Sequence, residues 1–205
     1  MVSAHKSVRM SWRESLQELP KPQRKMLQGG GLSQRFLNLP LDVTHPALIG
    51  ALYGLLVGLS LILPIGYDQG WNLSDWWRAF VLNTLFVMMV AASLGLFSRI
   101  IVGITARPPI SPPRKVLYPM PFVGLAWLSL EMTELLDFWI WGAWLLLLIP
   151  GPLYVHLSWA PRWRLLCRLE DGLDPFDGKL MVEEEDTAGG DEELAEVVAV
   201  FDEEE

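Results

Sequence analysis

The sequence contains a single cysteine, Cys167, among its 205 residues. One thiol excludes an intramolecular disulfide and any metal site built from several cysteines. The chain also lacks the sequence motifs of zinc proteases, serine hydrolases and phosphate-binding loops. We therefore expect no catalytic residues, no metal site and no cofactor, and a protein that is not an enzyme.

Positive charge is also scarce, and it is unevenly distributed. The chain has 16 basic and 24 acidic residues, and 12 of the acids follow Val182, where there is no Lys or Arg. Residues 1–182 therefore carry an excess of basic groups, whereas residues 183–205 form an acidic tail. Such a tail repels nucleic acid, so we expect no nucleic-acid partner.

Apolar residues, by contrast, are abundant. They make up 51% of the chain, which includes 10 Trp, and the mean hydropathy is +0.29. This composition is typical of an integral membrane protein. A helix needs about 20 apolar residues to cross the roughly 30 Å hydrocarbon layer. Four segments are predicted to cross it: residues 46–66, 76–98, 117–136 and 138–159.

The basic residues predict the orientation of these four segments. Seven precede the first segment, four lie between the second and third, and four follow the fourth, so the other two connections hold only Arg78. Cytoplasmic loops accumulate Lys and Arg. We therefore expect an all-α, four-span helical bundle in contact with membrane lipid, with both termini in the cytoplasm.

The same reading divides the chain into four parts. Residues 1–45 form a basic region whose amphipathic helix, around Trp12 and Leu16, either lies on the inner membrane surface or packs against the protein. Residues 46–159 hold the spans, and residues 160–182 form a basic interfacial segment that begins with a second amphipathic helix. Residues 183–205 are predicted to be a disordered acidic tail.

Small residues recur at helical spacing in the first two spans. Gly50, Gly54 and Gly58 repeat every four residues, and Ala91 and Gly95 lie four residues apart in the second span. Small side chains at this spacing allow two helices to approach closely. We expect these residues to form a helix-packing seam, either within the chain or against another subunit or a second copy.

Three acids interrupt the apolar run that contains the third and fourth spans. Glu131, Glu134 and Asp137 are spaced by three residues, which places them on one helix face if the third helix continues that far. The first interpretation is a solvated turn on the outer side of the membrane. The alternative is a cation or proton site that includes Asn83, which would make the chain a small transporter or channel component.

Two histidines give a third hypothesis. His45 and His156 lie near the cytoplasmic ends of the first and fourth spans. Histidines on facing helices can hold a tetrapyrrole, although histidines at this level more often form hydrogen bonds to helix ends. The corresponding function is a tetrapyrrole-carrying membrane subunit.

The acidic tail contains an apolar stripe. Leu194, Val197, Val198 and Phe201 follow the spacing i, i+3, i+4 and i+7 between clusters of acids. This pattern fits a segment that folds into a basic-rimmed groove of a cytoplasmic protein, or else a solubilising tail. The leading hypothesis for the whole chain is a non-catalytic accessory protein, an assembly factor or small subunit of a larger membrane complex.

Overall fold

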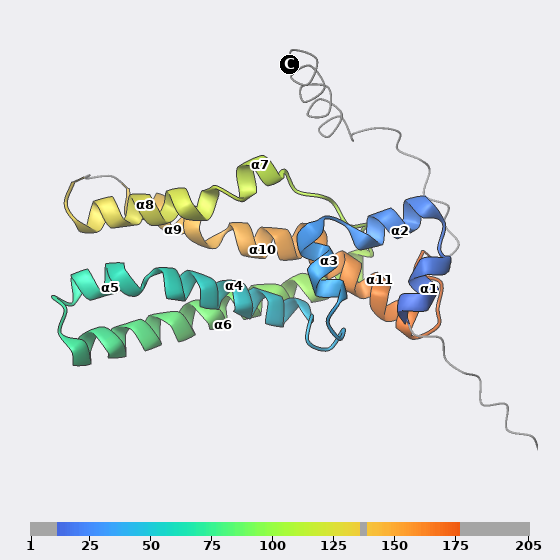
Figure 1. Ribbon diagram of the computed structural model, residues 1–205, viewed down its shortest axis with the longest axis horizontal. Helices are drawn as coiled ribbons and strands as arrows, with labels where there is room; N and C mark the ends of the chain where they lie inside the picture. Colours follow the sequence, from blue (N-terminus) through green and yellow to red (C-terminus); the bar gives the residue numbers. More distant parts are fainter. Residues whose placement is uncertain (1–11, 136–138, 177–205) are drawn as a thin grey trace, which may run out of the picture. The chain divides into compact units, whose positions relative to one another are not determined.

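The computed structural model describes residues 12–135 and 139–176, and every regular element in these ranges is a helix (Figure 1). In chain order these are α1 (Trp12–Glu18), α2 (Lys21–Gln28), α3 (Gly31–Leu37), α4 (Pro46–Ser60), α5 (Ile62–Asp68), α6 (Leu73–Thr105), α7 (Arg114–Leu117), α8 (Met120–Met132), α9 (Ile140–Leu148), α10 (Pro150–Tyr154), the π-helical turn η1 (Val155–Trp159) and α11 (Ala160–Glu170). The all-α prediction is thus confirmed for these ranges. The stripe of Leu194, Val197, Val198 and Phe201 lies outside them.

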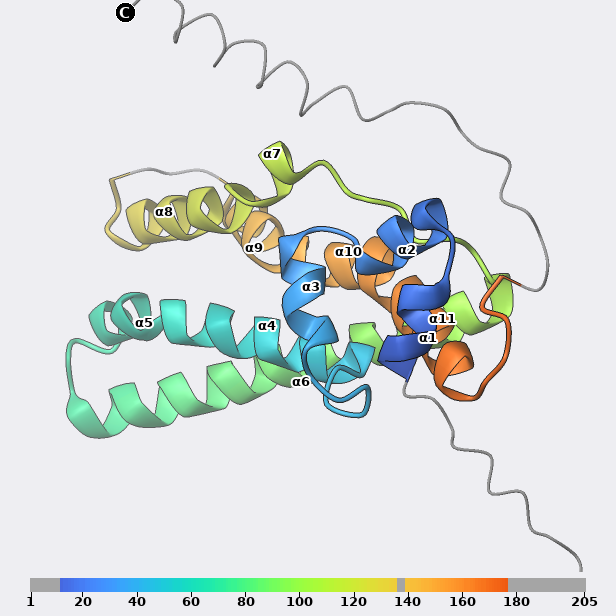
Figure 2. The same ribbon diagram turned by 45° about the vertical axis from the view of Figure 1, so that its right-hand side comes forward.

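Two helix pairs form the body of residues 12–175. α4 and α5 run alongside α6, and α8 runs alongside α9 (Figure 1 and Figure 2). Side chains from both pairs meet in one buried cluster that includes Val57, Val87, Leu128 and Leu147. The turn from α5 to α6 and the turn after α8 lie at one end of the pairs, and helices α1, α2, α3 and α11 lie at the other.

Two helices in the described ranges are long and apolar enough to cross a membrane. They are α6, with 33 residues, and the continuous 31-residue helix Ile140–Glu170, which comprises α9, α10, η1 and α11. α4 and α5 supply a third if this pair, bent by 47°, is one span. The predicted segment 117–136 contains α8, whose 13 residues rise only about 20 Å. Two or three of the four predicted spans therefore have a matching helix.

The last span continues further than the sequence suggested. We expected a span that ends near Trp159 and a separate interfacial helix after it. Instead α11 continues from η1 without a break in the helix. Pro161 therefore lies inside a continuous helix, where its missing N–H group leaves the Leu157 carbonyl without its usual helical donor.

A proline accounts for the bend between α4 and α5. Pro64 has no N–H group to donate to the carbonyl of Ser60, and its ring crowds that carbonyl. α4 ends at Ser60, whose hydroxyl donates a hydrogen bond to the Val57 carbonyl at 2.7 Å. The apolar run continues in α5, so the bend redirects the helix without ending the apolar segment.

The N-terminal helices bury their apolar face within the protein. Trp12 and Leu16 of α1 are buried, and α1 packs against α11. Of the two alternatives for the described part of this helix, the structure therefore favours packing against the protein. Arg13 donates hydrogen bonds to the carbonyls of Leu37 and Asn38, which belong to the last turn and the cap of α3. A cation at this end of a helix satisfies carbonyls that have no partner in the helix.

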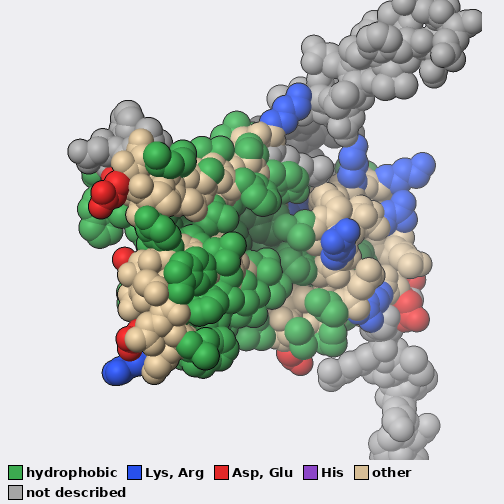
Figure 3. Space-filling model, turned by 60° about the vertical axis from the view of Figure 1, so that its left-hand side comes forward, with side chains coloured by type: hydrophobic (Ala, Val, Ile, Leu, Met, Phe, Trp, Pro, Cys, Tyr) green, Lys and Arg blue, Asp and Glu red, His purple; other side chains and the backbone are tan. Residues whose placement is uncertain are grey.

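Hydrophobic side chains cover the outward faces of the long helices. Figure 3 shows them over the helix pairs, whereas Lys and Arg side chains gather toward the end that carries α1, α2 and α3. In each of the two long helices, only 28% of the most apolar window is buried inside the protein. Exposed apolar area on this scale needs lipid or another apolar surface to cover it.

The glycines of the first span lie against α6. A methyl group on Gly50 would collide with the Ala91 carbonyl, and one on Gly54 would lie 2.7 Å from Met88 Cα. Gly58 faces the side chain of Thr84, whose buried hydroxyl oxygen has no hydrogen-bond partner among the described residues. These contacts, with Gly95 of α6 against the Pro46 carbonyl, form the α4–α6 seam.

We predict that Gly54→Ala lowers the free energy of unfolding by about 1–3 kcal/mol, because the added methyl would meet backbone atoms of α6 that cannot move aside alone. The matched control is Gly103→Ala in α6, where nothing lies within 4 Å of an added methyl. That change should be neutral or slightly stabilising, since Ala favours helix more than Gly does. Thermal unfolding in mild detergent measures both variants, and equal shifts would contradict a tight seam.

Candidate functional site

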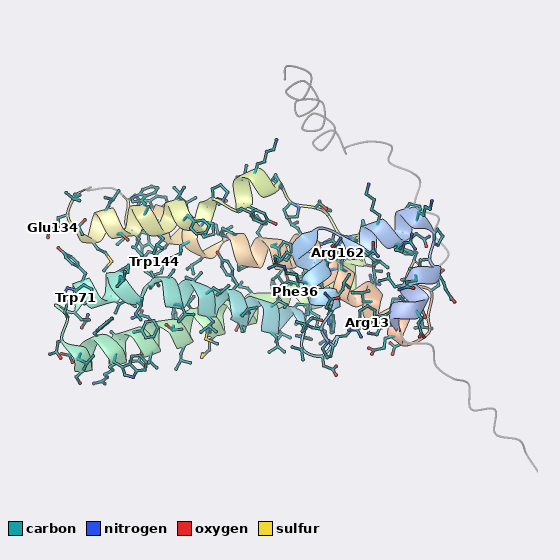
Figure 4. The ribbon with its side chains drawn as sticks, viewed as in Figure 1. Arg13, Phe36, Trp71, Glu134, Trp144 and Arg162 are labelled. Carbon is teal, nitrogen blue, oxygen red and sulfur yellow. The ribbon has the colours of Figure 1, made fainter. Side chains whose placement is uncertain are left out.

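The predicted acidic site lies at the end of the molecule that carries the two turns. Glu131 is in the last turn of α8, which ends at Met132. Glu134 therefore lies beyond the helix, in a left-handed conformation with φ of 57° (Figure 4). The helix thus does not continue as far as Glu134, which was the condition for the three acids to share one helix face. Asp137 lies outside the described residues.

Asn83 does not point into the protein interior. Its side chain is exposed on α6 and donates a hydrogen bond to the Ala79 carbonyl, one turn earlier in the same helix, at 2.8 Å. Its amide is therefore used within its own helix. Among residues 12–135 and 139–176, no group of three or more His, Cys, Asp or Glu side chains is placed to hold a metal ion.

The two histidines have separate local roles. His45 caps α4: its Nδ1 accepts a hydrogen bond from the Ala47 N–H at 3.2 Å, and its ring meets Trp163 edge-on at 4.8 Å. His156 lies in η1, and its Nδ1 shares a hydrogen bond of 2.7 Å with the Ser98 hydroxyl of α6. The His45 ring thus binds α4 and the His156 ring binds α6, through separate hydrogen bonds.

A buried arginine is the most distinctive polar group in the structure. Arg162 of α11 is only 2% exposed. Its Nε donates to the Met26 carbonyl in α2 at 2.9 Å, and its Nη1 donates to the Ser158 carbonyl at 3.2 Å and to the hydroxyls of Ser158 and Ser33. One side chain therefore ties α2, α3 and η1 to α11 (Figure 4).

Gly29 makes room for this arginine. It ends α2 in a left-handed conformation with φ of 59°, which L side chains rarely adopt. A methyl group at this position would lie 2.7 Å from the Arg162 guanidinium carbon. Gly29 thus allows the chain to turn after α2 and also leaves space for the guanidinium.

A small pocket opens beside Arg162. Its polar lining includes Ser33, Tyr154, Ser158 and Arg162, and the hydroxyls of Ser33 and Tyr154 lie 2.9 Å apart. Leu117, with Leu32 and Pro112, adds apolar lining. None of the described residues that line the pocket is acidic. The pocket therefore combines one guanidinium with several hydroxyls and a small apolar wall.

The link between α6 and α7 closes this region by binding η1. Pro161 cannot donate to the Leu157 carbonyl, and the N–H of Ile110 donates to that carbonyl instead, at 2.9 Å. Arg107 donates to the neighbouring carbonyl of His156. These two hydrogen bonds give partners to backbone carbonyls that have no donor within the π-helical turn.

Two tryptophans fix the segment that leads into α4. The indole N–H of Trp159 donates to the Thr44 carbonyl at 2.7 Å, and that of Trp163 donates to the Leu41 carbonyl at 2.9 Å. Trp159 is fully buried and meets Phe36 of α3 edge-on at 5.0 Å. Both indoles therefore hold the chain between α3 and α4 against the last span.

Sequence reasoning assigned Arg162 to the basic residues of an interfacial helix and missed its burial. The available signal was the helical spacing of Ser158, Arg162, Leu165 and Leu169, all of which the structure buries. An arginine within such an apolar stripe indicates a buried, hydrogen-bonded cation. The hydrogen-bond partners of Arg162 on α2 and α3 could not be predicted from any local pattern in the sequence.

Comparison with known proteins adds no family to this description. No protein-family model, curated protein or solved structure matches the chain. The functional argument therefore depends on the geometry above.

The cap formed by His45 predicts a pH-dependent stability. Burial, and secondly the charge of Arg99, lower the pKa of His45 below its ordinary value of 6.5. The unfolded chain therefore binds the proton more readily, so this stabilisation is present above pH 6.5 and is lost as the pH falls below it. His45→Asn keeps a capping acceptor but does not titrate.

We expect the melting temperature of His45→Asn to fall less than that of the wild type between about pH 7.5 and about pH 5.5. Thermal unfolding in one detergent at both pH values measures this difference. His45→Ala, which removes the cap, should be less stable at both values. Equal pH dependence in wild type and His45→Asn would show that the cap does not titrate in this range.

Proposed function

We propose that this chain is a non-catalytic, multi-pass membrane accessory protein, an assembly factor or small subunit of a larger membrane complex. The observation that carries the proposal is the outward-facing apolar surface of α6 and Ile140–Glu170, since only 28% of the most apolar window of each helix is buried inside the chain. Lipid covers such surface in a lone protein, and the helices of other subunits cover part of it in a complex.

Four spans with both termini in the cytoplasm fit the arrangement of the helices. The turns after α5 and after α8 lie at one end, as two helical hairpins with the same orientation require. The connections predicted to lie outside hold only Arg78 of the 16 basic residues. α8 has only 13 residues and is too short to cross the hydrocarbon layer alone, so the proposed third span also includes the residues on either side of this helix.

An accessory role is favoured over transport by where the polar side chains lie. A transport path needs polar groups that converge at mid-membrane, often beside broken helices. Asn83 is exposed and bonded within α6, and Thr84 is enclosed by the α4–α6 seam. The extensive polar network described above, around Arg162, instead joins helices at the end that carries α1, α2 and α3.

The four-span topology predicts which introduced thiols an impermeant reagent can reach. In a Cys167→Ser background, Thr133→Cys should be labelled in intact cells, and Asp171→Cys should be labelled only after the membrane is permeabilised. Both positions are exposed in the protein, so burial does not separate them. Gel shift with a maleimide reagent measures labelling. Labelling of Asp171→Cys in intact cells would contradict the topology.

The accessory role predicts a cytoplasmic partner for the tail. Val198→Asp with Phe201→Asp should remove one specific protein from detergent pull-downs, because both changes fall on the apolar stripe. Ala199→Asp with Val200→Asp adds the same charge on another face of a helix and should leave that protein bound. Quantitative mass spectrometry of the pull-downs at low and high salt measures this. Identical partner sets for all three chains would contradict the docking role.

A further inference from the structure

We propose that one face of α6 packs against the same face of α6 in a second copy of this chain. The inference rests on the membrane placement proposed above and names a partner for the accessory role. Seven exposed residues define this face, which we call the α6 row: Asn83, Phe86, Val90, Ser93, Phe97, Ile100 and Ile104. They are separated alternately by three and four residues, which is the heptad spacing of two helices that pack along their length.

The α6 row lies apart from the α4–α6 seam. Ala91 and Gly95 of α6 are buried against α4, whereas Val90 and Phe97 of the row are 40% and 59% exposed. Figure 1 and Figure 2 show α6 at the edge of the two helix pairs, with α4 and α5 between α6 and α8. A second copy can therefore approach the row without displacing α8 or α9.

The Asn83 amide requires a partner more polar than lipid. In the proposed span, Asn83 lies about 10 Å along the helix from Trp76, within the hydrocarbon layer. One of its side-chain N–H groups donates to the Ala79 carbonyl at 2.8 Å, and no described residue donates to its side-chain oxygen. An amide has two N–H groups and an oxygen that accepts two hydrogen bonds. Lipid tails offer no partner for the groups that remain, so their exposure to hydrocarbon is costly.

A second copy supplies the matching group by symmetry. Two chains with the same orientation in the membrane are related by a twofold axis along the membrane normal, so α6 packs parallel to its counterpart. In parallel heptad packing, Asn83, Val90 and Phe97 each meet the same residue of the second copy. The two Asn83 amides then lie at one depth, where each can donate to the other and accept from it. Neither lipid tails nor an apolar helix can replace this contact.

The α6 row is long enough for an extensive contact. From Asn83 to Ile104 the helix rises about 32 Å, which is the thickness of the hydrocarbon layer. Ser93 is small and lets the two backbones approach, while Phe86 and Phe97 provide large side chains for packing. The Ser93 hydroxyl donates to the Met89 carbonyl of its own helix at 2.8 Å, so its hydrogen needs no further acceptor. One polar pair within an apolar row fixes the register of the two helices.

Disulfide cross-linking in isolated membranes tests the contact with the full-length chain in a Cys167→Ser background. Phe97→Cys and Val90→Cys should each give a product with the mass of two copies under a membrane-permeant oxidant. The reason is that a disulfide forms only where two Cα atoms approach within about 7 Å. Denaturing gels without reductant, with mass spectrometry of the product, measure the cross-link.

The matched controls are Leu96→Cys and Met89→Cys. Each lies beside a tested residue in the sequence and is also exposed, so it has nearly the same depth and access to the oxidant. Successive residues of a helix point about 100° apart, which turns both controls away from the second copy. They should give several-fold less cross-linked product than Phe97→Cys and Val90→Cys.

Substitution of Asn83 separates the polar contact from apolar packing. Asn83→Leu should raise the dissociation constant of the dimer about tenfold, because the hydrogen bonds between the amides are lost. Asn83→Gln keeps an amide and should weaken the dimer less. Native mass spectrometry across a series of detergent dilutions measures both constants, and melting temperatures of the diluted monomers report any effect on the fold itself.

The outcomes separate this inference from the proposed function. Equal cross-linking of row and control cysteines, or none from either in membranes that contain the chain, would overturn the contact. A product that joins Phe97→Cys to a different protein would assign the row to another subunit and overturn the second copy as its occupant. An unchanged dissociation constant in Asn83→Leu would overturn the role of the amide. A chain absent from membrane fractions would overturn the proposed function.

Discussion

The close approach of α4 and α6 is the constraint on which the rest of the structure depends. Lipid solvates apolar helices as well as other helices do, so these two pack stably only where small residues bring their backbones together. Gly50 and Gly54 provide that contact by facing Ala91 and Met88. With α4 held in place, Tyr53 reaches across to donate to the Leu147 carbonyl of α9 at 2.6 Å. The seam thus fixes one helix pair and positions a side chain that binds the other.

Prolines interrupt the helical hydrogen bonds in two apolar segments, and the structural consequence differs between the two. At Ser60 the break bends the helix by 47° and leaves the apolar run continuous. At η1 the released carbonyls of His156 and Leu157 bind Arg107 and the Ile110 N–H, so the link after α6 is tied to the last span. Irregular backbone within a membrane protein requires internal partners of this kind. The pocket beside Arg162 exists because this link closes over η1.

Local patterns in the sequence predicted the apolar helices and the glycines of the seam, because both depend on periodicity within one segment. The end of α8 at Met132 was not predictable in the same way, since no glycine or proline marks the turn and Glu134 adopts a left-handed conformation usually left to glycine. The burial of Arg162 was missed because its partner Met26 lies 136 residues away in the sequence. Contacts over such separations are set by the assembled fold.

The two ends of the helix pairs are stabilised by different kinds of contact. At the end with the turns, Trp71 and Glu134 adopt left-handed conformations in short connections. At the other end, arginines and tryptophans donate to carbonyls of three separate segments, α2, α3 and the link before α4, as Arg162 does to Met26 and Trp159 to Thr44. Such a network joins segments that are distant in the sequence, so the packing of the N-terminal helices depends on several buried hydrogen bonds that form together.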